Sequence, residues 1–428
     1  MSDLYRLSAS EAARRIAAGT LTSRALVEAC LERIARREGD VGAWAHLDPD
    51  QALAEARARD QSGVGGPLHG VPIGVKDIMD TADMPTAYGS RIYRGHRPAA
   101  DAACVALARA AGAIILGKTV TTEFAALSPG KTRNPHHRDH TPGGSSSGSA
   151  AGVADFMMPL AFGTQTAGSI LRPASYCGGV GMKPSFGLIA TAGTKPLAPS
   201  LDTIGGFARS VADIALLLAA LTDRPELRPT APAQRPRIGV YYPQPWDQAQ
   251  PATLAALDAA REALARAGAA AGDRAAFLAF DGLVAAQQAI MNHEAARNLA
   301  WERLNRASEI MPRTAAMLAD GVAVTAAAYD AARREAAAAR AQLGAFFGDF
   351  DAMLVPAAPG EAPPIATTGD PVFNRPWTLL HLPCISLPGH RGPAGLPVGV
   401  QLVGRPGEDA RLLAIALFVE AAFAAVRG

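Results

Sequence analysis

Residues 141–149 read Thr-Pro-Gly-Gly-Ser-Ser-Ser-Gly-Ser, and this stretch decides which fold and which chemistry the sequence predicts. A run of Ser and Gly is by itself typical of a loop or a linker. The residues that follow, 150–160, are small and apolar. The stretch therefore leads directly into a buried helix, and it is better interpreted as a tight turn that presents serine hydroxyls.

Two further segments give this turn its meaning. Residues 70–78 form an apolar run that predicts a buried strand and contains Lys76. Residues 163–169, Gly-Thr-Gln-Thr-Ala-Gly-Ser, predict a strand that ends in a tight turn at Ser169. A lysine and two serines suffice for a hydrolase that uses neither histidine nor metal: the lysine is the base, one serine relays the proton and the other is the nucleophile.

Lys76 can act as a base only when its amine is neutral. Burial in an apolar strand lowers a lysine pKa from about 10.4, because the charged form loses its solvation. The alternative is a structural ion pair between Lys76 and the neighbouring Asp77. Alternation along a strand, however, points Asp77 to the opposite face of the sheet.

These residues resemble the amidase-signature hydrolases, which use a Ser–cis-Ser–Lys triad on amides. The resemblance rests on Gly143-Gly144-Ser145-Ser146, on Gly168-Ser169-Ile170, and on the run from Cys177 to Pro184; Ser169 follows Ser145 by 24 positions, as in the family. It extends over most of the chain, from about residue 67 to 403.

The resemblance implies a role for each residue of the site. Lys76 would be the base, Ser145 the relay after a cis peptide bond from Gly144, and Ser169 the nucleophile. Backbone N–H groups of the turn would form the oxyanion hole, with further residues in support; the implied donors are Thr166, Ala167, Gly168 and Ser169, and the supporting residues are Gly144, Ser146 and Gln165. No metal and no cofactor are implied.

The sequence departs from the family at three positions. Gln165 stands where the family usually has Asp, and Ala167 and Ser147 stand where it usually has Gly. Gln165 removes a charge next to the nucleophile turn. Ala167 keeps its backbone N–H but adds a methyl group and restricts the backbone. We expect catalysis to survive and the acyl pocket to differ.

The predicted fold is α/β, a single large domain over 1–428 with a central mixed β-sheet covered on both faces by α-helices. Its expected parts are N-terminal helices over 8–62, a signature core over about 67–222, a helical substrate-pocket region over about 252–347, and C-terminal strands and a helix over 350–428. Ser8 and Glu11 predict a capping box at the start of the first helix. Residues 252–347 are rich in Ala, Arg, Glu and Leu and should be helical.

Composition and charge exclude several other classes. Among 428 residues, 49% are hydrophobic, and the net charge of +2 gives no basic footprint for nucleic acid. No apolar run is long enough for a membrane span, and no secretion signal is visible. The four cysteines are scattered, so we expect a cytoplasmic protein. Helical surfaces rich in Ala and Leu permit a homodimer.

Three other motifs suggest chemistry of a different kind. Residues 112–119 match a phosphate-loop pattern, but their Ala-Ile-Ile-Leu centre predicts a buried strand. Residues 134–140 contain three His and Asp139; metal ligation is one interpretation, and a polar loop at the active-site entrance is the other. Lys183 offers a second candidate base, but a structural or surface role fits its place before Pro184 better.

The expected function is therefore an amidase that hydrolyses a small amide C–N bond through an acyl-enzyme on Ser169. A carbamate (urethane) or aryl ester hydrolase with the same triad is the alternative. The amidase component of a tRNA-dependent amidotransferase is a third hypothesis, which would require partner subunits.

Overall fold

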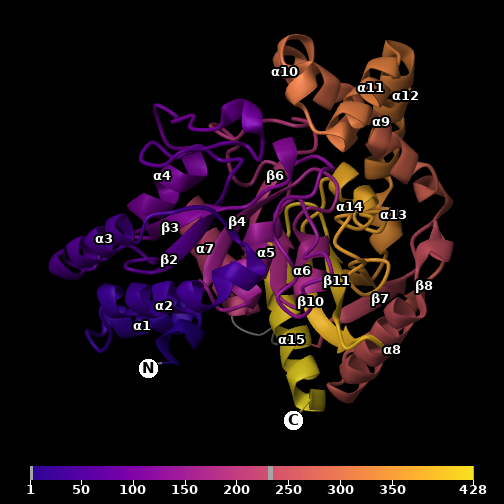
Figure 1. The fold of residues 1–428 in the computed structure, drawn as a ribbon. Coiled ribbons are helices and arrows are strands. Elements are labelled where there is room, and N and C mark those ends of the chain that lie inside the picture. Colours follow the sequence, from indigo (N-terminus) through magenta and orange to yellow (C-terminus); the bar gives the residue numbers. More distant parts are fainter. Residues whose placement is uncertain (1–2, 230–234, 428) are drawn as a thin grey trace.

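One mixed sheet of eleven strands organises the computed structural model, which describes residues 3–229 and 235–427 (Figure 1). The strand order is β1-β3-β2-β4-β6-β5-β10-β11-β9-β7-β8. β2 runs parallel to β3 and β4, whereas β4, β6, β5, β10, β11 and β9 pair antiparallel in turn. This confirms the predicted mixed α/β sheet; the expected single span over 1–428 also includes residues 1–2, 230–234 and 428, which lie outside the described residues.

The strands have the following bounds: β1 (Trp44–Leu47), β2 (Pro72–Lys76), β3 (Ile114–Thr119), β4 (Leu160–Gln165), β5 (Val180–Lys183), β6 (Thr203–Ala208), β7 (Arg237–Tyr241), β8 (Ala270–Arg274), β9 (Ala352–Pro356), β10 (Cys384–Arg391) and β11 (Pro397–Gly404).

The α-helices have these bounds: α1 (Ala9–Ala17), α2 (Ser23–Val41), α3 (Pro49–Gln61), α4 (Ala103–Ala110), α5 (Ser147–Ala154), α6 (Leu171–Cys177), α7 (Val211–Thr222), α8 (Pro251–Arg266), α9 (Leu283–Asn298), α10 (Ala300–Asn305), α11 (Pro312–Ala323), α12 (Ala326–Ala341), α13 (Leu343–Phe347), α14 (Arg375–Leu379) and α15 (Asp409–Arg427).

Both faces of the sheet are covered, because neighbouring residues of one strand enter different hydrophobic cores. Ile115 of β3 packs in a core with α4, α7, α8 and α15, whereas Ile114 and Leu116 pack in a second core with α2, α3 and α5. Phe162 and Ala161 of β4 divide in the same way. Alternation along a strand sends successive side chains to opposite faces, so the predicted helix layers on both faces are confirmed.

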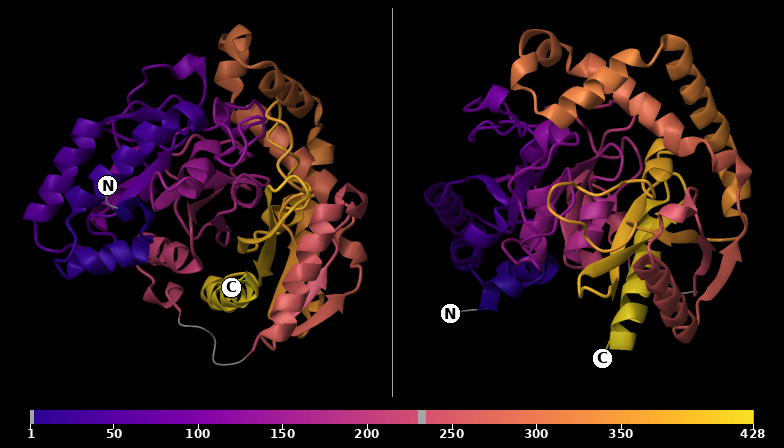
Figure 2. Two further views of the ribbon diagram at one scale, coloured as in Figure 1. Left: turned by 60° about the horizontal axis from the view of Figure 1, so that its bottom comes forward. Right: turned by 45° about the vertical axis from the view of Figure 1, so that its right-hand side comes forward.

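Helices α9–α12 lie together at one end of the molecule (Figure 1). Both views of Figure 2 place this orange segment beside the yellow C-terminal segment, and the chain ends lie at the far side from α10 in Figure 1. α9 packs against α11, α12 and α14. No helix among the described residues is both long and apolar enough to cross a membrane.

The expectation that residues 252–347 are entirely helical is wrong at one place. Gly268, with φ +77°, follows α8, and residues 270–274 then form β8. This strand pairs parallel with β7 at the edge of the sheet. Alanine favours a helix locally, but the free edge of β7 offers a complete set of backbone partners, and this tertiary pairing overrides the local preference.

The phosphate-loop pattern at residues 112–119 is a buried strand, as predicted, because residues 114–119 form β3. Lys118, which would contact phosphate in a phosphate loop, is fully buried here. The Lys118 Nζ lies 3.4 Å from Asp77 Oδ1 and donates to Met79 O at 2.7 Å. Asp77 therefore forms an ion pair with Lys118 and not with Lys76, in agreement with the strand alternation that points Asp77 and Lys76 to opposite faces.

This buried pair generates a stability prediction. Asp77→Asn removes the only carboxylate that forms an ion pair with Lys118 among the described residues, and removing one partner of a buried pair is strongly destabilising. We expect the free energy of unfolding to fall by about 3 kcal/mol, measured by urea denaturation.

The matched control is Glu28→Gln, which removes the carboxylate of an exposed pair with Arg24. Exposed pairs contribute little. If both substitutions changed the unfolding free energy equally, the burial of the Lys118–Asp77 pair would not matter to stability.

Candidate active site

Lys76 lies at the end of β2, fully buried, and points to two hydroxyl groups. Its Nζ is 2.7 Å from Ser145 Oγ and 2.7 Å from Thr164 Oγ1. No carboxylate of the described residues forms an ion pair with it. Burial holds the pKa of Lys76 well below its usual value, and the charge of Asp202 opposes this only in part. The site thus contains a desolvated amine within hydrogen-bond reach of a serine.

The peptide bond from Gly144 to Ser145 is cis, as the family resemblance implies. Arg172 holds this peptide, since its Nη2 donates to Gly144 O at 2.6 Å. A side chain at Gly144 would not fit, because a Cβ there would lie 2.7 Å from Thr368 Cγ2. Ser146 fixes the turn to β4 through its hydroxyl, which donates to Thr164 O at 3.2 Å.

Residues 166–169 form a turn in which three of the backbone carbonyl groups accept hydrogen bonds. Gln287 donates to the carbonyl of Thr166 at 2.8 Å, Thr378 donates to that of Ala167 at 2.8 Å, and the carbonyl of Gly168 accepts from the N–H of Arg172. No acceptor among the described residues takes the backbone N–H of Thr166, Ala167, Gly168 or Ser169. Four N–H groups in one turn are therefore free to meet a ligand.

Gln165 replaces the family aspartate without losing its place in the structure. Its Oε1 accepts from the N–H groups of Ile170 and Leu171 at 2.9 and 3.1 Å, at the start of α6. Its Nε2 donates to Thr378 Oγ1 at 2.9 Å. A neutral amide thus ties the turn to α6 and α14. The third departure, Ser147, begins α5 and donates to Val120 O at 3.3 Å.

Ser169 is 8% exposed and borders a small cavity. The cavity volume is about 20 Å³, enough for about one water molecule. A wider cavity of about 310 Å³ shares four lining residues with it, namely Leu127, Met291, Met317 and Arg375. Its other walls come from α9, α11 and residues 367–369. The wider cavity is thus the approach to Ser169.

Of the two hydrogen bonds expected for Ser145, to Lys76 and to Ser169, the structure contains the first. Ser145 is hydrogen-bonded to Lys76, but no hydrogen bond joins Ser145 to Ser169 within the described residues. Catalytic hydrogen bonds are often long before substrate binds.

Two guanidinium groups border the Ser169 cavity. Arg172 is 4% exposed, and its Nη1 has no partner among the described residues, although Nη2 and Nε bind Gly144 O and Thr368 O. Arg375 donates to Gln287 Oε1, and burial lowers the pKa of Arg375 to about 10. An unpaired buried guanidinium beside a cavity favours an anionic group there.

Asp202 supports the turn from the other side. It accepts from Thr166 Oγ1 at 2.5 Å and from the N–H groups of Leu197 and Ala198 at 2.9 and 3.0 Å. Burial raises the pKa of Asp202 to about 6, against the lowering effect of these bonds. The Asp202 carboxylate thus holds the side chain of Thr166, while the backbone N–H of Thr166 stays free.

The remaining sequence candidates lie elsewhere. Lys183 is fully buried in β5 and donates to Pro184 O at 2.9 Å, so its role is structural rather than at the surface. Residues 134–140 line neither cavity beside Ser169, so their expected position at the entrance is wrong; His136 instead borders a separate cavity with Gly178 and His390. Within the described part of the chain, no three His, Cys, Asp or Glu side chains are placed to hold a metal ion.

Sequence reasoning missed four residues of the site: Thr164, Arg172, Asp202 and Arg375. A signal existed for Arg172, because it follows Ser169 by only three residues, at the start of α6, and both line the same cavity. Thr164 could be inferred from the parallel pairing of β2 with β4, which brings their ends together. Asp202 and Arg375 come from distant segments that no local pattern connects to Ser169.

Comparisons with known proteins agree with this geometry. A family model described as Amidase matches residues 25–413. A glutamyl-tRNA(Gln) amidotransferase subunit from Chloroflexus aggregans is 34% identical over 97% of this chain and 96% of its own length. A crystal structure of an amidase superposes with a TM-score of 0.89 at 32% identity, covering 97% of this chain and 99% of that one.

A 6-aminohexanoate cyclic dimer hydrolase, solved with its substrate, superposes with a TM-score of 0.88 at 26% identity, covering 99% of this chain and 98% of that one. The match to the family model covers most of the sequence, and the similarity in sequence and structure extends over nearly all of it. The chain belongs to the amidase family and is a hydrolase that acts on carbon–nitrogen bonds other than peptide bonds.

Proposed function

We propose that this amidase hydrolyses a small amide through an acyl-enzyme on Ser169, with Lys76 as base and acid and Ser145 as proton relay. The observation that carries the proposal is the buried Lys76 amine, 2.7 Å from Ser145 Oγ and without a carboxylate partner among the described residues. A neutral amine in this place can accept a proton from a serine.

In the proposed first half-reaction, the Ser169 hydroxyl oxygen attacks the amide carbon. Its proton passes to Ser145, whose own proton passes to Lys76. The developing oxyanion is stabilised by the free N–H groups of residues 166–169, where one such donor contributes about 2.7–4 kcal/mol. The C–N bond then breaks as the leaving amine takes a proton back from Lys76 through Ser145. Water attacks the acyl-enzyme by the same route in the second half-reaction.

The residues around Ser169 support a small substrate that carries a carboxylate near the scissile carbonyl. The cavity that Ser169 borders is small, Arg172 and Arg375 both line it, and Nη1 of Arg172 is buried without a hydrogen-bond partner among the described residues. A carboxylate would satisfy both guanidinium groups. Small carbamates and aryl esters present the same kind of electrophile, so turnover of these remains the alternative within the same mechanism.

A second candidate function is supported by the curated relatives, which are named as subunits of a glutamyl-tRNA(Gln) amidotransferase. In that case ammonia would leave the amide donor as the acyl-enzyme forms, for use by partner subunits, and water would then hydrolyse the acyl-enzyme. Amide turnover by the isolated chain favours the stand-alone amidase. Activity that appears only with co-purified partner subunits favours the amidotransferase.

The nucleophile is tested by covalent labelling. A fluorophosphonate should react with the hydroxyl of Ser169, and peptide mass spectrometry should locate the adduct there. Ser169→Ala should lose both the adduct and amide turnover, by several orders of magnitude, while its circular dichroism spectrum stays unchanged. An adduct on Ser145 or Ser146 in the unaltered chain would contradict the assignment.

The role of Lys76 predicts a pH dependence. The protonated amine cannot accept a proton, so kcat/KM should rise with pH through one ionisation as Lys76 becomes neutral. Because burial lowers the pKa of Lys76, this rise should lie below the pH at which an exposed lysine titrates.

The same role predicts a difference between leaving groups. Lys76→Ala should reduce amide hydrolysis far more than hydrolysis of an activated aryl ester, because a good leaving group does not need a proton. Equal losses on both substrates would contradict a role as acid, and unchanged rates on both would remove Lys76 from the mechanism.

Arg172 predicts a preference among substrates. Arg172→Gln should reduce kcat/KM for succinamate by about 10–100-fold relative to the neutral butyramide, since a hydrogen bond to a charged group contributes about 1.5–3 kcal/mol. The ratio of kcat/KM for succinamate to that for butyramide separates the two roles of Arg172. Loss of its hydrogen bond to Gly144 O would slow both substrates, whereas loss of carboxylate recognition would slow succinamate alone. An unchanged ratio would contradict the carboxylate preference.

A further inference from the structure

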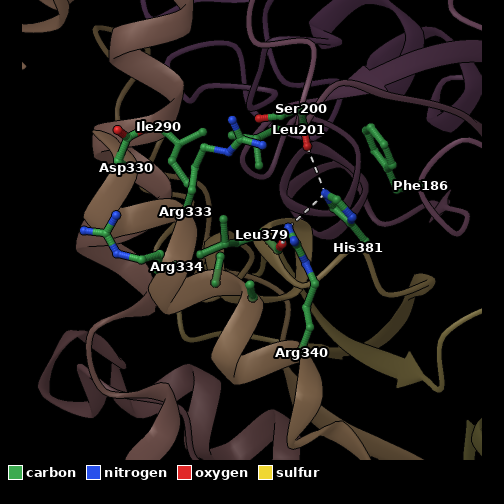
Figure 3. Close-up of a pocket in the computed structure, with 12 residues that line it drawn as sticks. Phe186, Ser200, Leu201, Ile290, Asp330, Arg333, Arg334, Arg340, Leu379 and His381 are labelled. Atoms are coloured by element: carbon green, nitrogen blue, oxygen red, sulfur yellow. Dashed lines mark hydrogen bonds between the residues drawn. The ribbon is translucent and has the colours of Figure 1, made fainter. Parts of the chain in front are cut away.

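A second large cavity lies apart from Ser169. Its volume is about 450 Å³, and it lies between α12, the end of α14 with His381, and residues 200–201 (Figure 3). It shares no lining residue with either cavity at the active site. Ile290 faces this cavity and the next residue, Met291, faces the approach to Ser169, so α9 separates the two.

The charge that lines this cavity is predominantly positive. One face of α12 contributes Arg333 and Arg340, and Arg334 stands beside them. No carboxylate of the described residues lies within ion-pair distance of any of the three, whereas Arg109 is paired with three carboxylates. The only carboxylate in the lining is Asp330.

The other titratable groups that face these arginines offset their charge only in part. Glu294, from α9, accepts hydrogen bonds from the N–H and hydroxyl of Ser200 and from the hydroxyl of Tyr329, and it forms no ion pair with the three arginines among the described residues. Burial, with the charges of Arg340 and Lys183, lowers the pKa of His381 to about 4, so the imidazole is neutral at pH 7. Burial and the nearby charge of Arg333 also lower the pKa of Arg340.

The arginines differ in where they point. Arg333 extends across the cavity to Ser200, whereas Arg334 points away along the outer rim (Figure 3). The Nη2 of Arg340 donates to Leu379 O at 2.7 Å and lies 3.1 Å from His381 Nε2. The Nε of Arg340 is buried without a partner among the described residues. Arg333 and Arg340 thus converge on one space from two turns of α12.

The rest of the wall is apolar or aromatic. Phe186 stacks on His381 with ring centroids 4.1 Å apart and an angle of 14° between the planes. Leu201, Ile290 and Leu379 form the remaining side. Cationic groups on one side and an apolar surface on the other are typical of sites for organic anions, in which a few polar groups fix the orientation.

We propose that this cavity binds a small organic anion with at least two negative charges, held by Arg333 and Arg340, with its carbon part against Leu201, Ile290 and Leu379. Binding would relieve the repulsion between the two guanidinium groups. Phosphate esters and polycarboxylates share the chemistry that this site recognises. The site is independent of the proposed reaction at Ser169.

Isothermal titration calorimetry of the full chain tests this proposal, with citrate and pyrophosphate as multivalent probes and acetate as the monovalent control. All titrations are made at one ionic strength, because salt screens the interaction. We expect saturable binding with one site for at least one multivalent probe and none for acetate. Absence of binding by both multivalent probes would overturn the proposal.

Two variants of equal charge identify the place of binding. Arg333→Gln should weaken binding about tenfold or more, which corresponds to the loss of one charge-assisted contact. Arg334→Gln, on the same helix but pointing outward, should weaken it much less. Equal effects would mean that the anion responds to the overall charge of α12, and this would contradict a site in the cavity.

A third variant separates this site from the active site, which has its own arginines. Binding should persist in Arg172→Gln, which removes the unpaired guanidinium beside Ser169. Loss of binding in Arg172→Gln with retention in Arg333→Gln would place the anion at Ser169 and overturn the proposal. Failure of the amidase mechanism, by contrast, would leave these titrations unchanged.

Discussion

The site depends on one constraint, the complete burial of the Lys76 amine among neutral groups. The Lys76 amine has two hydrogen-bond partners, the hydroxyl groups of Ser145 and Thr164. The next residue in the chain, Asp77, points to the other face of the sheet and forms an ion pair with Lys118. A carboxylate in contact would raise the pKa of Lys76 and keep the amine protonated, so that it could not accept a proton. The neighbouring strands therefore have to supply polarity without charge, and β4 does so with Thr164.

The turn at residues 166–169 is held in place because three of its four carbonyl groups accept hydrogen bonds. Side chains from α9 and α14 hold the carbonyl groups of Thr166 and Ala167, and Asp202 holds the Thr166 hydroxyl. Donors fixed in advance need no reorganisation when charge develops on a substrate. Gln165 joins this network as a neutral donor and acceptor, so the structure accommodates the lost family aspartate with hydrogen bonds instead of a charge.

Helix α9 connects the active site with the rest of the helical segment. Gln287 donates to Thr166 O in the turn at residues 166–169, Met291 borders the approach to Ser169, and Ile290 faces the arginine-lined cavity. In the proposed function, the small cavity at Ser169 and the arginines that line it would limit the substrate by size and charge together. Residues of α9 thus contribute to the walls of both the approach to Ser169 and the arginine-lined cavity.

The sequence alone predicted a mixed sheet, most helices and the candidate residues Lys76, Ser145 and Ser169, because hydrophobic alternation, capping residues and tightly spaced Gly and Ser are local signals. Ser8 caps α1 as predicted, but the Glu11 side chain, which would complete the predicted capping box, accepts hydrogen bonds from Arg14 and Arg15 instead. Only the tertiary structure decided the partners that come from distant segments. β8 formed in spite of its helical composition because β7 offered an open edge. Packing brings Asp202 and Gln287 to Thr166 in the turn that ends at Ser169, and it brings Arg375 to the cavity beside Ser169. Such contacts depend on how elements pack rather than on residue order, so no local pattern contains them.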